Sequence, residues 1–362
     1  MRLSRQRLIF SPVVFSLGAV TPAYATLENH IADGRFAVGE FQVDVSRQGQ
    51  LSVIHGNRHL FDTLPGEAWI KSGIQHIDAK ENRGSFIINE QLAQQCDYQT
   101  IDAVSASTDR VEIAGTISGD AACTSPYHLT FIRLRTGHLQ FQLRFDNAAV
   151  NYSVLQYQST PDERFYGFGE QFSLLNMKGH AVPILSQEGG VGRGQLPITP
   201  IINLGSPGSG GNAFSTYYAV PQYITSNNTS VFLENTTYSV FDLTHTDRVQ
   251  IRLFDGAMTG RILAGDSMLE LIERFTEYSG RMRPLPDWFN EGAIVGMQGG
   301  TEKVKQVQQE LQRRGTPVAG YWLQDWVGKR KTRVGSQLWW NWELDRDRYP
   351  DWNVLVDSIE AD

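Results

Sequence analysis

The sequence has little of several things that mark common functional sites. It contains two cysteines, and neither a Cys-x-x-Cys nor a His-Glu-x-x-His pattern occurs, so no zinc site of a usual kind is predicted. All eight histidines precede residue 246, and their scattered spacing indicates neither a catalytic triad nor a metal site. Positive charge is also scarce, because 32 lysines and arginines face 39 aspartates and glutamates. A net charge of −7 provides little of the basic surface that phosphate contacts need, which argues against nucleic-acid binding.

Three glycine-rich stretches fall short of a phosphate-binding loop. Residues 166–170 (YGFGE) and 190–194 (GVGRG) both begin like Gly-x-Gly-x-x-Gly, but Phe172 and Gln195 stand where the third glycine is required. The stretch GSPGSGG at 205–211 lacks the Lys and the Ser or Thr that complete a P-loop. We therefore expect tight turns or loop tips at these places.

The first 25 residues have the parts of a secretory signal peptide. Three arginines make the start basic, the run LIFSPVVFSLGAV is apolar, and Ala23 and Ala25 form a small-x-small cleavage pattern. An uncleaved anchor is the alternative, but a proline and a glycine interrupt the run, and no later stretch is long and apolar enough for a membrane helix. Cleavage would take the net charge from −7 to −10, because residues 1–25 contain three arginines and no acid. We expect a secreted or periplasmic protein.

The two cysteines allow two arrangements. In the oxidising compartment that a signal peptide implies, Cys96 and Cys123 can form one disulfide across a hairpin-rich region. Two separate buried thiols are the alternative, and the sequence does not decide between them.

Residues 26–283 are predicted to form an antiparallel β-sandwich. From about Phe41 to Arg283, short segments alternate apolar and polar residues, and turns rich in Gly, Asn or Asp separate them. The clearest are FQVDVS, QLSVIHG, SFIINEQ, RVEIAGTI, YHLTFIRLR and HLQFQLRF. Many strands without intervening helices are typical of a sandwich. Near the end, SMLELIERFTEYSG at 267–280 has helical spacing and stops at a glycine.

The pattern changes over residues 284–362. After the proline-rich linker RPLPDW, the stretch EGAIVGMQGG predicts a buried strand, TEKVKQVQQELQRRG a helix with Thr301 as its cap, and VAGYWLQDW a second buried strand. A βαβ unit with apolar strands indicates a parallel sheet covered by helices. A (β/α)₈ barrel needs roughly 250 residues, and 75 follow Asp287. We interpret this part as the start of a (β/α)₈ TIM barrel, with a small α/β appendage as the alternative.

Tryptophans and glutamines gather at the predicted strand ends. Five of the eight tryptophans lie between Trp322 and Trp342. A sugar site uses flat aromatic walls for the apolar ring face and amides for the hydroxyls, and in a barrel such groups lie at the C-terminal strand ends. We expect Trp322 and Trp342 to pack between the barrel and the sandwich, and Trp340 to line a sugar site.

Four stretches together carry a family resemblance: FYGFGEQF, EGGVGRG, MQGGTE and QDWVGKRKTRVGSQLWWNWELD. They resemble family 31 of the glycoside hydrolases, and most of all its bacterial branch of sulfoquinovosidases and related α-glucosidases. The resemblance covers the chain from about residue 30 to its end. It implies a galactose-mutarotase-like β-sandwich followed by a catalytic (β/α)₈ barrel.

The resemblance also implies a retaining mechanism with an aspartate nucleophile and an aspartate acid/base. The family places both on later barrel strands, so we expect both beyond residue 362 and assign neither role to Asp325 or Glu343. No cofactor or metal is expected, because the chemistry needs only carboxylates. These 362 residues by themselves are expected to hydrolyse nothing.

The sulfoquinovosidase branch carries a substrate-binding set of two glutamines, an arginine, a tryptophan and a later tyrosine. The glutamines match Gln298 and Gln324, and the tryptophan matches Trp340, but Gln337 stands at the position of the arginine. Sulfonate is a permanent anion that arginine holds best, whereas a glutamine amide suits a neutral hydroxymethyl group. The substitution favours an uncharged α-glucoside.

Further residues bear on this site. Arg330 and Arg333 are near Gln337 in the sequence and could compensate in part for the missing arginine. Sandwich loops around Glu170 and Gln171, and the loop that ends at Arg193, are expected to close over the sugar. The sequence thus predicts a retaining α-glucosidase acting on a small-molecule α-glycoside. The alternatives are a sulfoquinovosidase of the same family and a secreted, non-catalytic carbohydrate-binding sandwich.

Overall fold

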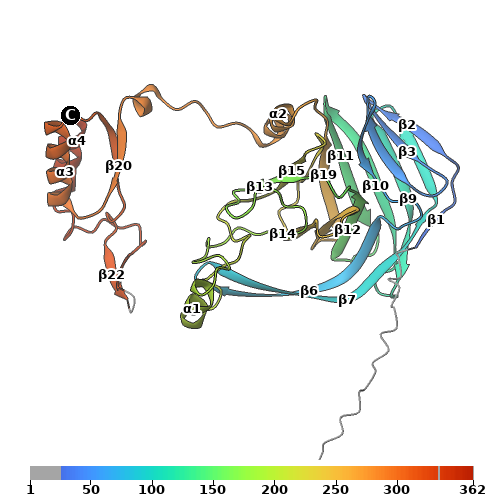
Figure 1. Ribbon diagram of the computed structural model, residues 1–362, viewed down its shortest axis with the longest axis horizontal. Coiled ribbons are helices and arrows are strands. Elements are labelled where there is room, and N and C mark those ends of the chain that lie inside the picture. Colours follow the sequence, from blue (N-terminus) through green and yellow to red (C-terminus); the bar gives the residue numbers. More distant parts are fainter. Residues whose placement is uncertain (1–25, 333–334, 362) are drawn as a thin grey trace, which may run out of the picture. The chain divides into compact units, whose positions relative to one another are not determined.

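The computed structural model describes residues 26–332 and 335–361 (Figure 1). The predicted signal peptide, residues 1–25, lies outside the described part. The chain divides into two compact units between Gly280 and Arg281, close to the boundary expected at residue 283. Each unit has its own hydrophobic core, so each is described by itself.

The first unit consists mostly of antiparallel strands, arranged in one 15-stranded and one four-stranded sheet. The strands are β1 (Leu27–Asn29), β2 (Gly34–Val38), β3 (Phe41–Val45), β4 (Leu51–His55), β5 (Arg58–Asp62), β6 (Ile70–Asn82), β7 (Ser85–Ile101), β8 (Ala103–Ser107), β9 (Arg110–Gly119), β10 (Ser125–Arg135), β11 (His138–Phe145), β12 (Tyr152–Gln158), β13 (Phe165–Gly169), β14 (Ala181–Ile184), β15 (Ala219–Thr225), β16 (Ser230–Leu233), β17 (Ser239–Asp242), β18 (Arg248–Leu253) and β19 (Ala257–Leu263). The large sheet has the order β13-β15-β16-β19-β11-β10-β9-β7-β6-β12-β18-β17-β14, to which β1 is added by pairing with β7 and β8 by pairing with β9, and the small sheet is β2-β3-β4-β5.

The six clearest sequence segments are all confirmed as strands: β3, β4, β7, β9, β10 and β11. Their alternation places one set of side chains inward, as in β3, where Phe41, Val43 and Val45 are buried and the residues between them are not.

The large sheet folds over on itself and encloses this core. Tyr157 of β12 contacts Tyr223 of β15 through the two hydroxyls, although the two strands are far apart in the sheet order. Phe168 of β13 and Phe241 of β17 come from opposite ends of the same order, and their ring centroids are 5.4 Å apart. The result is the antiparallel sandwich arrangement that the sequence predicts.

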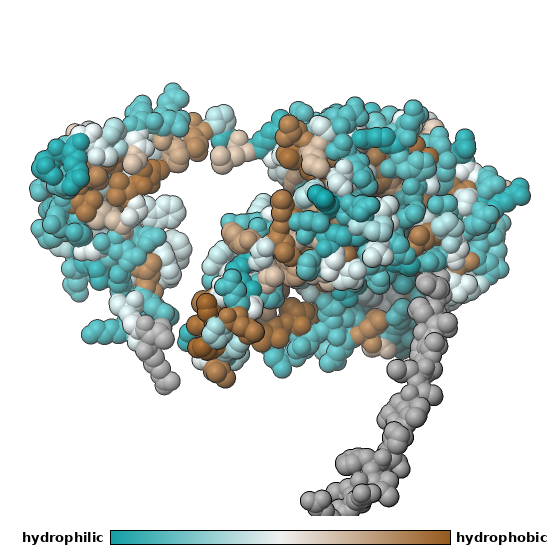
Figure 2. Space-filling view, in the orientation of Figure 1, coloured by the Kyte–Doolittle hydropathy of each residue, from teal (hydrophilic) through white to brown (hydrophobic). Residues whose placement is uncertain are grey.

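A long hairpin, β6 and β7, extends from the sandwich and carries helix α1 (Ile198–Gly205) near its tip (Figure 1). The Asn82 amide donates to the Ser206 hydroxyl at 3.0 Å and to the Pro207 carbonyl at 2.7 Å, and this anchors the segment after the helix. Exposed apolar side chains gather around α1, and Figure 2 shows them as a brown group; they include Leu196, Ile198, Ile201 and Leu204.

Helix α2 (Met268–Ser279) ends the first unit and confirms the helix predicted at 267–280. Its cap is Ser267, whose side chain accepts from the Glu270 backbone N–H at 3.2 Å. The helix stops at Gly280, which has a positive φ of 83° that suits glycine.

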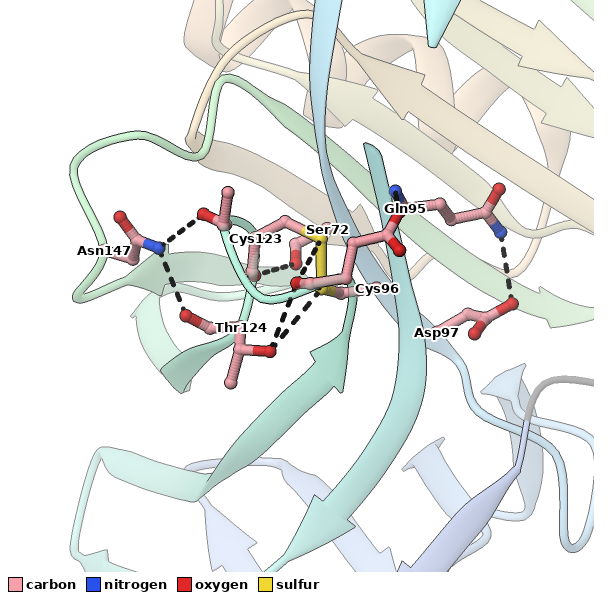
Figure 3. Close-up of a disulfide and its surroundings, with 9 residues drawn as sticks. Ser72, Gln95, Cys96, Asp97, Cys123, Thr124 and Asn147 are labelled. Atoms are coloured by element: carbon pink, nitrogen blue, oxygen red, sulfur yellow. Dashed lines mark hydrogen bonds between the residues drawn. A yellow bond between two sulfur atoms is a disulfide. The ribbon is translucent and has the colours of Figure 1, made fainter. Parts of the chain in front are cut away.

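Cys96 and Cys123 form a disulfide, one of the two arrangements that the sequence leaves open (Figure 3). The bond joins β7 to the turn before β10, and both residues are fully buried. The Ser72 hydroxyl donates to the Cys123 carbonyl at 3.1 Å, and the Asn147 amide donates to the carbonyls of Ala122 and Thr124.

The second unit has the order η1 (Asp287–Asn290), β20 (Ala293–Met297), α3 (Thr301–Arg313), β21 (Val318–Leu323), β22 (Lys329–Thr332), β23 (Gly335–Leu338) and α4 (Trp352–Glu360). Strands β20 and β21 pair in parallel, and β22 and β23 form an antiparallel ribbon. Val304 of α3 and Leu355 of α4 pack with Met297 and Leu323 of the strands. The predicted βαβ unit is therefore present.

Two details of this unit differ from the sequence prediction. The strands are not fully buried: Ile294 is 42% and Trp322 is 65% exposed, because the helices pack on the face that bears Met297 and Leu323. Thr301 is not the cap of α3, since Gly300 holds that position and Thr301 is the first helical residue. The Thr301 hydroxyl instead donates to the Pro350 carbonyl at 3.3 Å.

Candidate functional site

Two glutamines meet at the carboxyl ends of β20 and β21. Parallel strands end at the same edge of a sheet, so Gln298 after β20 and Gln324 after β21 become neighbours. The Gln298 amide nitrogen donates to the Gln324 amide oxygen at 2.8 Å, and the Gln324 backbone N–H donates to the Met297 carbonyl at 3.0 Å. Both side chains are exposed. The structure thus brings together two of the predicted site residues.

Asp325, the residue after Gln324, is a buried anchor. Its carboxylate is fully buried and accepts from the Gly299 backbone N–H at 2.9 Å, from the Arg348 guanidinium at 3.0 Å and from the Tyr349 hydroxyl. Burial and the neighbouring Asp325 carboxylate raise the pKa of the Tyr349 hydroxyl, which keeps that group protonated as a donor. With three donors on it, this carboxylate ties the end of β21 to the start of α3 and to residues 348–349.

The loop of residues 326–345 follows Asp325 in the sequence and contains the other predicted residues of this unit, Gln337 and Trp340. Its base is closed by hydrogen bonds from the Gly328 N–H to the Asp325 carbonyl at 3.0 Å and from the Asp345 N–H to the Trp326 carbonyl at 2.9 Å. Between these residues the chain forms the β22–β23 ribbon. The loop therefore begins on the side of the sheet where Gln298 and Gln324 meet.

Gln337 lies on β23, opposite Arg330 of β22. Its side chain is exposed and makes no hydrogen bond with Gln298 or Gln324 within the described residues. Arg333, the other cation considered at this place, lies outside the described residues. The structure thus puts Gln337 on the same loop as the predicted site without joining it to the glutamine pair.

The tryptophans of the loop form a chain of ring contacts. The Trp340 ring lies 6.0 Å from that of Trp342, which lies 6.4 Å from that of Trp326. Trp326 packs against the core of the second unit, whereas Trp340 is 53% exposed. Trp342 is 74% exposed, and Trp322 is 65% exposed. Neither of these two rings is buried within this unit.

Trp322 instead borders an apolar hollow of about 490 Å³ between β21 and α4. Trp326 and Trp352 line the same hollow. None of the four predicted sugar-binding residues of this unit takes part in it. We therefore do not place the candidate site there.

The predicted site residues of the sandwich mostly make hydrogen bonds to the backbone of the loops and strands around them. Glu170 is exposed, and its backbone N–H donates to the Tyr218 carbonyl at 2.8 Å. The Gln171 amide donates to the Phe168 carbonyl at 3.1 Å. These contacts keep the two residues on a fixed turn after β13.

Arg193 acts as a clamp inside the loop between β14 and β15. Its guanidinium donates to three backbone carbonyls, those of Gly189 at 2.8 Å, Ala213 at 3.1 Å and Ser215. It also stacks over the Phe172 ring, with the guanidinium carbon 4.9 Å from the ring centroid. Most of its donors are therefore used within the loop, and its main role in this structure is to order that loop.

Sequence reasoning missed the partners of Asp325. Arg348 and Tyr349 are separated from it by the whole β22–β23 loop, and no motif links such distant positions. The sequence gives no signal for Tyr349, because it lies in the charged stretch DRDRYPD, and its complete burial is seen only in the structure.

Within residues 26–332 and 335–361, no three His, Cys, Asp or Glu side chains gather as a metal site would require. In the same residues, every helix is too short or too polar to span a lipid bilayer.

Comparison with known proteins adds three findings. The family profile described as the glycosyl hydrolase 31 N-terminal galactose mutarotase-like domain matches residues 37–242. The chain is 31% identical to the sulfoquinovosidase of Escherichia coli (strain K12) over 282 residues, which are 78% of this chain and 41% of that protein. It is also 31% identical to the sulfoquinovosidase of Agrobacterium fabrum over 297 residues, which are 82% and 42% of the two chains. This chain spans about two fifths of the length of these curated relatives.

A solved structure supports the same relationship. A family 31 sulfoquinovosidase from E. rectale, in complex with the aza-sugar inhibitor IFGSQ, superimposes with a TM-score of 0.78 at 26% identity. The alignment covers 88% of this chain and 46% of that one.

Proposed function

The chain belongs to glycosyl hydrolase family 31, and from this premise we propose that the protein hydrolyses α-glycosidic bonds with retention of configuration. Retention needs two carboxylates at short separation, one as nucleophile and one as acid/base. We assign neither role to Asp325, because its oxygens are occupied by three donors in the fold. The contribution that we propose for this chain is to bind and orient the sugar.

The glutamine pair at the ends of β20 and β21 carries this proposal. The contact between the two amides uses one N–H of Gln298 and the oxygen of Gln324. The Gln298 oxygen and the Gln324 amide nitrogen remain available on the exposed side, an acceptor next to a donor. Such a pair can bind two neighbouring sugar hydroxyls. We further propose that β20, α3, β21 and α4 begin a (β/α)₈ barrel, in which ligands bind at this end of the strands.

Gln337 and Trp340 complete the proposed sugar site. The indole of Trp340, half exposed, offers a flat wall to the apolar face of a pyranose. The Gln337 amide favours a neutral hydroxymethyl group over an anion, so our first candidate substrate is an α-glucoside acted on outside the cytoplasm.

A sulfoquinovoside is the second candidate. Two curated relatives and one solved relative are sulfoquinovosidases, and all three align over more than three quarters of this chain. Against this candidate stands Gln337, because a neutral amide is a weaker partner for sulfonate than a guanidinium.

The test is hydrolysis of two chromogenic substrates by the protein produced from its natural gene. We expect measurable kcat/KM on 4-nitrophenyl α-glucoside, with the α-anomer of glucose as first product in NMR. Hydrolysis of neither 4-nitrophenyl α-glucoside nor 4-nitrophenyl α-sulfoquinovoside would refute the proposal. A strong preference for the sulfonated substrate would refute the assignment of α-glucosides as the first candidate.

The variant Gln337→Arg tests the role of residue 337. We expect it to raise the kcat/KM ratio of the sulfonated to the neutral substrate by roughly tenfold or more, because a charge-assisted hydrogen bond replaces a neutral one. Ser336→Arg is the matched control, since Ser336 directly precedes Gln337 on β23 and its side chain is on the other face of the ribbon. Equal ratios in the two variants would exclude a specific role for position 337.

A further inference from the structure

Arg330 lies across the β22–β23 ribbon from Gln337, the position at which the sulfoquinovosidase branch has an arginine. In the β22–β23 ribbon, Arg330 is the direct cross-strand partner of Gln337. Residues opposite each other in an antiparallel pair point to the same face, with Cβ atoms about 5 Å apart. A guanidinium on its longer side chain therefore projects beside the Gln337 amide from the neighbouring strand.

Trp339 holds this guanidinium in a defined orientation. The guanidinium carbon of Arg330 lies 4.5 Å from the centroid of the Trp339 ring. Trp339 follows the last residue of β23, and its backbone N–H donates to the Gly328 carbonyl at 3.2 Å, which continues the pairing of the ribbon by one bond. A guanidinium stacked on an indole keeps its N–H groups in its own plane, where they can still donate to an oxyanion.

The donors of Arg330 are not used by the fold. In the part of the chain that the structure describes, Arg330 is exposed and its side chain makes no ion pair or hydrogen bond. The two other arginines that stack on an aromatic ring among the described residues are both occupied, Arg193 by three carbonyls and Arg261 by Glu234. Arg330 thus combines a fixed position with free donors.

The neighbouring residues make the ribbon basic. Lys329 and Lys331 flank Arg330 and are also exposed, in a chain whose overall net charge is −7. Because side chains alternate along a strand, both lysines point to the face opposite Arg330 and Gln337. They raise the local positive potential but do not face the position of residue 337.

We propose that Arg330 is a specificity-determining residue that binds an anionic substituent, such as a sulfonate, on the α-glycoside. This inference rests on the proposed function of the glutamine pair and adds an anionic sugar to its substrates. The cation of the site then comes from β22 rather than from position 337 of β23. A merely solvated surface arginine would leave substrate choice unchanged.

The test compares Arg330→Gln with Lys331→Gln in the protein produced from its natural gene. Lys331→Gln is a matched control, because it removes one exposed positive charge from the adjacent residue on the opposite face. The probes are 4-nitrophenyl α-sulfoquinovoside and 4-nitrophenyl α-glucoside. We expect Arg330→Gln to lower the sulfonated-to-neutral ratio of kcat/KM roughly tenfold or more, mainly through KM, and Lys331→Gln to change it less than about twofold.

Two further measurements separate a direct contact from a general field. Arg330→Lys keeps the charge but loses the planar fork, so its ratio should lie between those of the wild type and Arg330→Gln. Higher salt should weaken binding of the sulfonated substrate in the wild type more than in Arg330→Gln.

Each outcome decides something. An equal ratio in Arg330→Gln and Lys331→Gln overturns the inference, and so does a wild type that cleaves the glucoside but not the sulfoquinovoside; the proposed function survives in both cases. Cleavage of neither substrate overturns the proposed function and the inference together.

Discussion

Asp325 follows Gln324 at the end of β21, where a carboxylate could either react with a substrate or hold the fold. Its side chain is fully buried, and Gly299, Arg348 and Tyr349 donate to it. A buried carboxylate with these partners is costly to remove, because the donors left behind remain desolvated. The neighbouring residues Gln298 and Gln324 are exposed instead. Asp325 therefore supports the fold, whereas Gln324 next to it is available to bind a ligand.

The variant Asp325→Asn should destabilise the second unit by about 2–4 kcal/mol, since an amide replaces one acceptor oxygen by a donor that faces another donor. Urea denaturation followed by tryptophan fluorescence measures this, because every tryptophan except Trp69 lies after Arg281. Asp347→Asn, at an exposed carboxylate in the same loop, is the control and should cost less than about 0.5 kcal/mol. Equal losses in both variants would contradict the anchoring role.

At this scale, the sequence could predict neighbours that regular structure imposes. Gln298 and Gln324 meet because each follows one of two parallel strands. The contact of Asp325 with Arg348 and Tyr349 could not be predicted, since the path of an irregular loop decides it. The pairing of Arg330 with Gln337 could not be predicted either, because no residue pattern in the sequence specifies the register of β22 and β23.

At the scale of elements, the strands of the sandwich were the most predictable feature. Alternating side chains specify which face is buried, and all six segments with that pattern became strands. Strands β20 and β21 were also predictable, but their burial was not, because it depends on what covers the second face. The prediction that Thr301 caps α3 was wrong, because Gly300, with a φ of 82°, holds the cap position and Thr301 is the first helical residue.

Helix α2 is joined to the sheet through a buried histidine. His138 of β11 is fully buried, its Nε2 lies 3.2 Å from the Glu277 carboxylate of α2, and its Nδ1 lies 3.3 Å from the Arg261 guanidinium of β19. Arginine only donates, so Nδ1 must accept, and the ring is neutral with its proton on Nε2. Burial, together with the charges of Arg261 and Arg135, lowers the pKa of His138 despite the nearby Glu277.

This arrangement predicts a pH dependence of stability. The pKa of His138 is lower in the folded state than the ordinary value of 6.5, so the unfolded chain binds the proton more readily. The contribution of His138 to the free energy of unfolding should therefore be highest above about pH 6.5 and decrease as the pH falls through that value toward the folded pKa. Urea denaturation of the first unit at pH 7.5 and 5.5, followed by circular dichroism, measures the difference.

The variant His138→Gln should lose part of this pH dependence, because it removes the titrating group. His76→Gln, at an exposed histidine of β6, is the control and should retain the wild-type difference. The window from pH 7.5 to 5.5 avoids the titration of ordinary carboxylates. An unchanged pH dependence in His138→Gln would show that other groups cause it.

At the scale of the whole molecule, the two units differ greatly in what they bury. The first encloses a continuous core that draws on strands from β2 to β19, with a disulfide in addition. In the second, the fully buried apolar side chains of the core are Val304, Tyr349 and Leu355, and its parallel sheet has two strands. Small units with few buried residues have a small free energy of unfolding. Among the described residues, the two cores have no member in common.

We therefore expect two unfolding transitions in calorimetry of the 362-residue chain, with the second unit melting first. Tryptophan fluorescence should follow the lower transition, and far-UV circular dichroism of the strands should mainly follow the upper one. Leu355→Ala should lower only the first, by about 2–5 kcal/mol in unfolding free energy, and Leu143→Ala of β11 only the second, since both leucines are almost fully buried in separate cores. A single transition that both substitutions shift equally would mean that the two units unfold as one cooperative body.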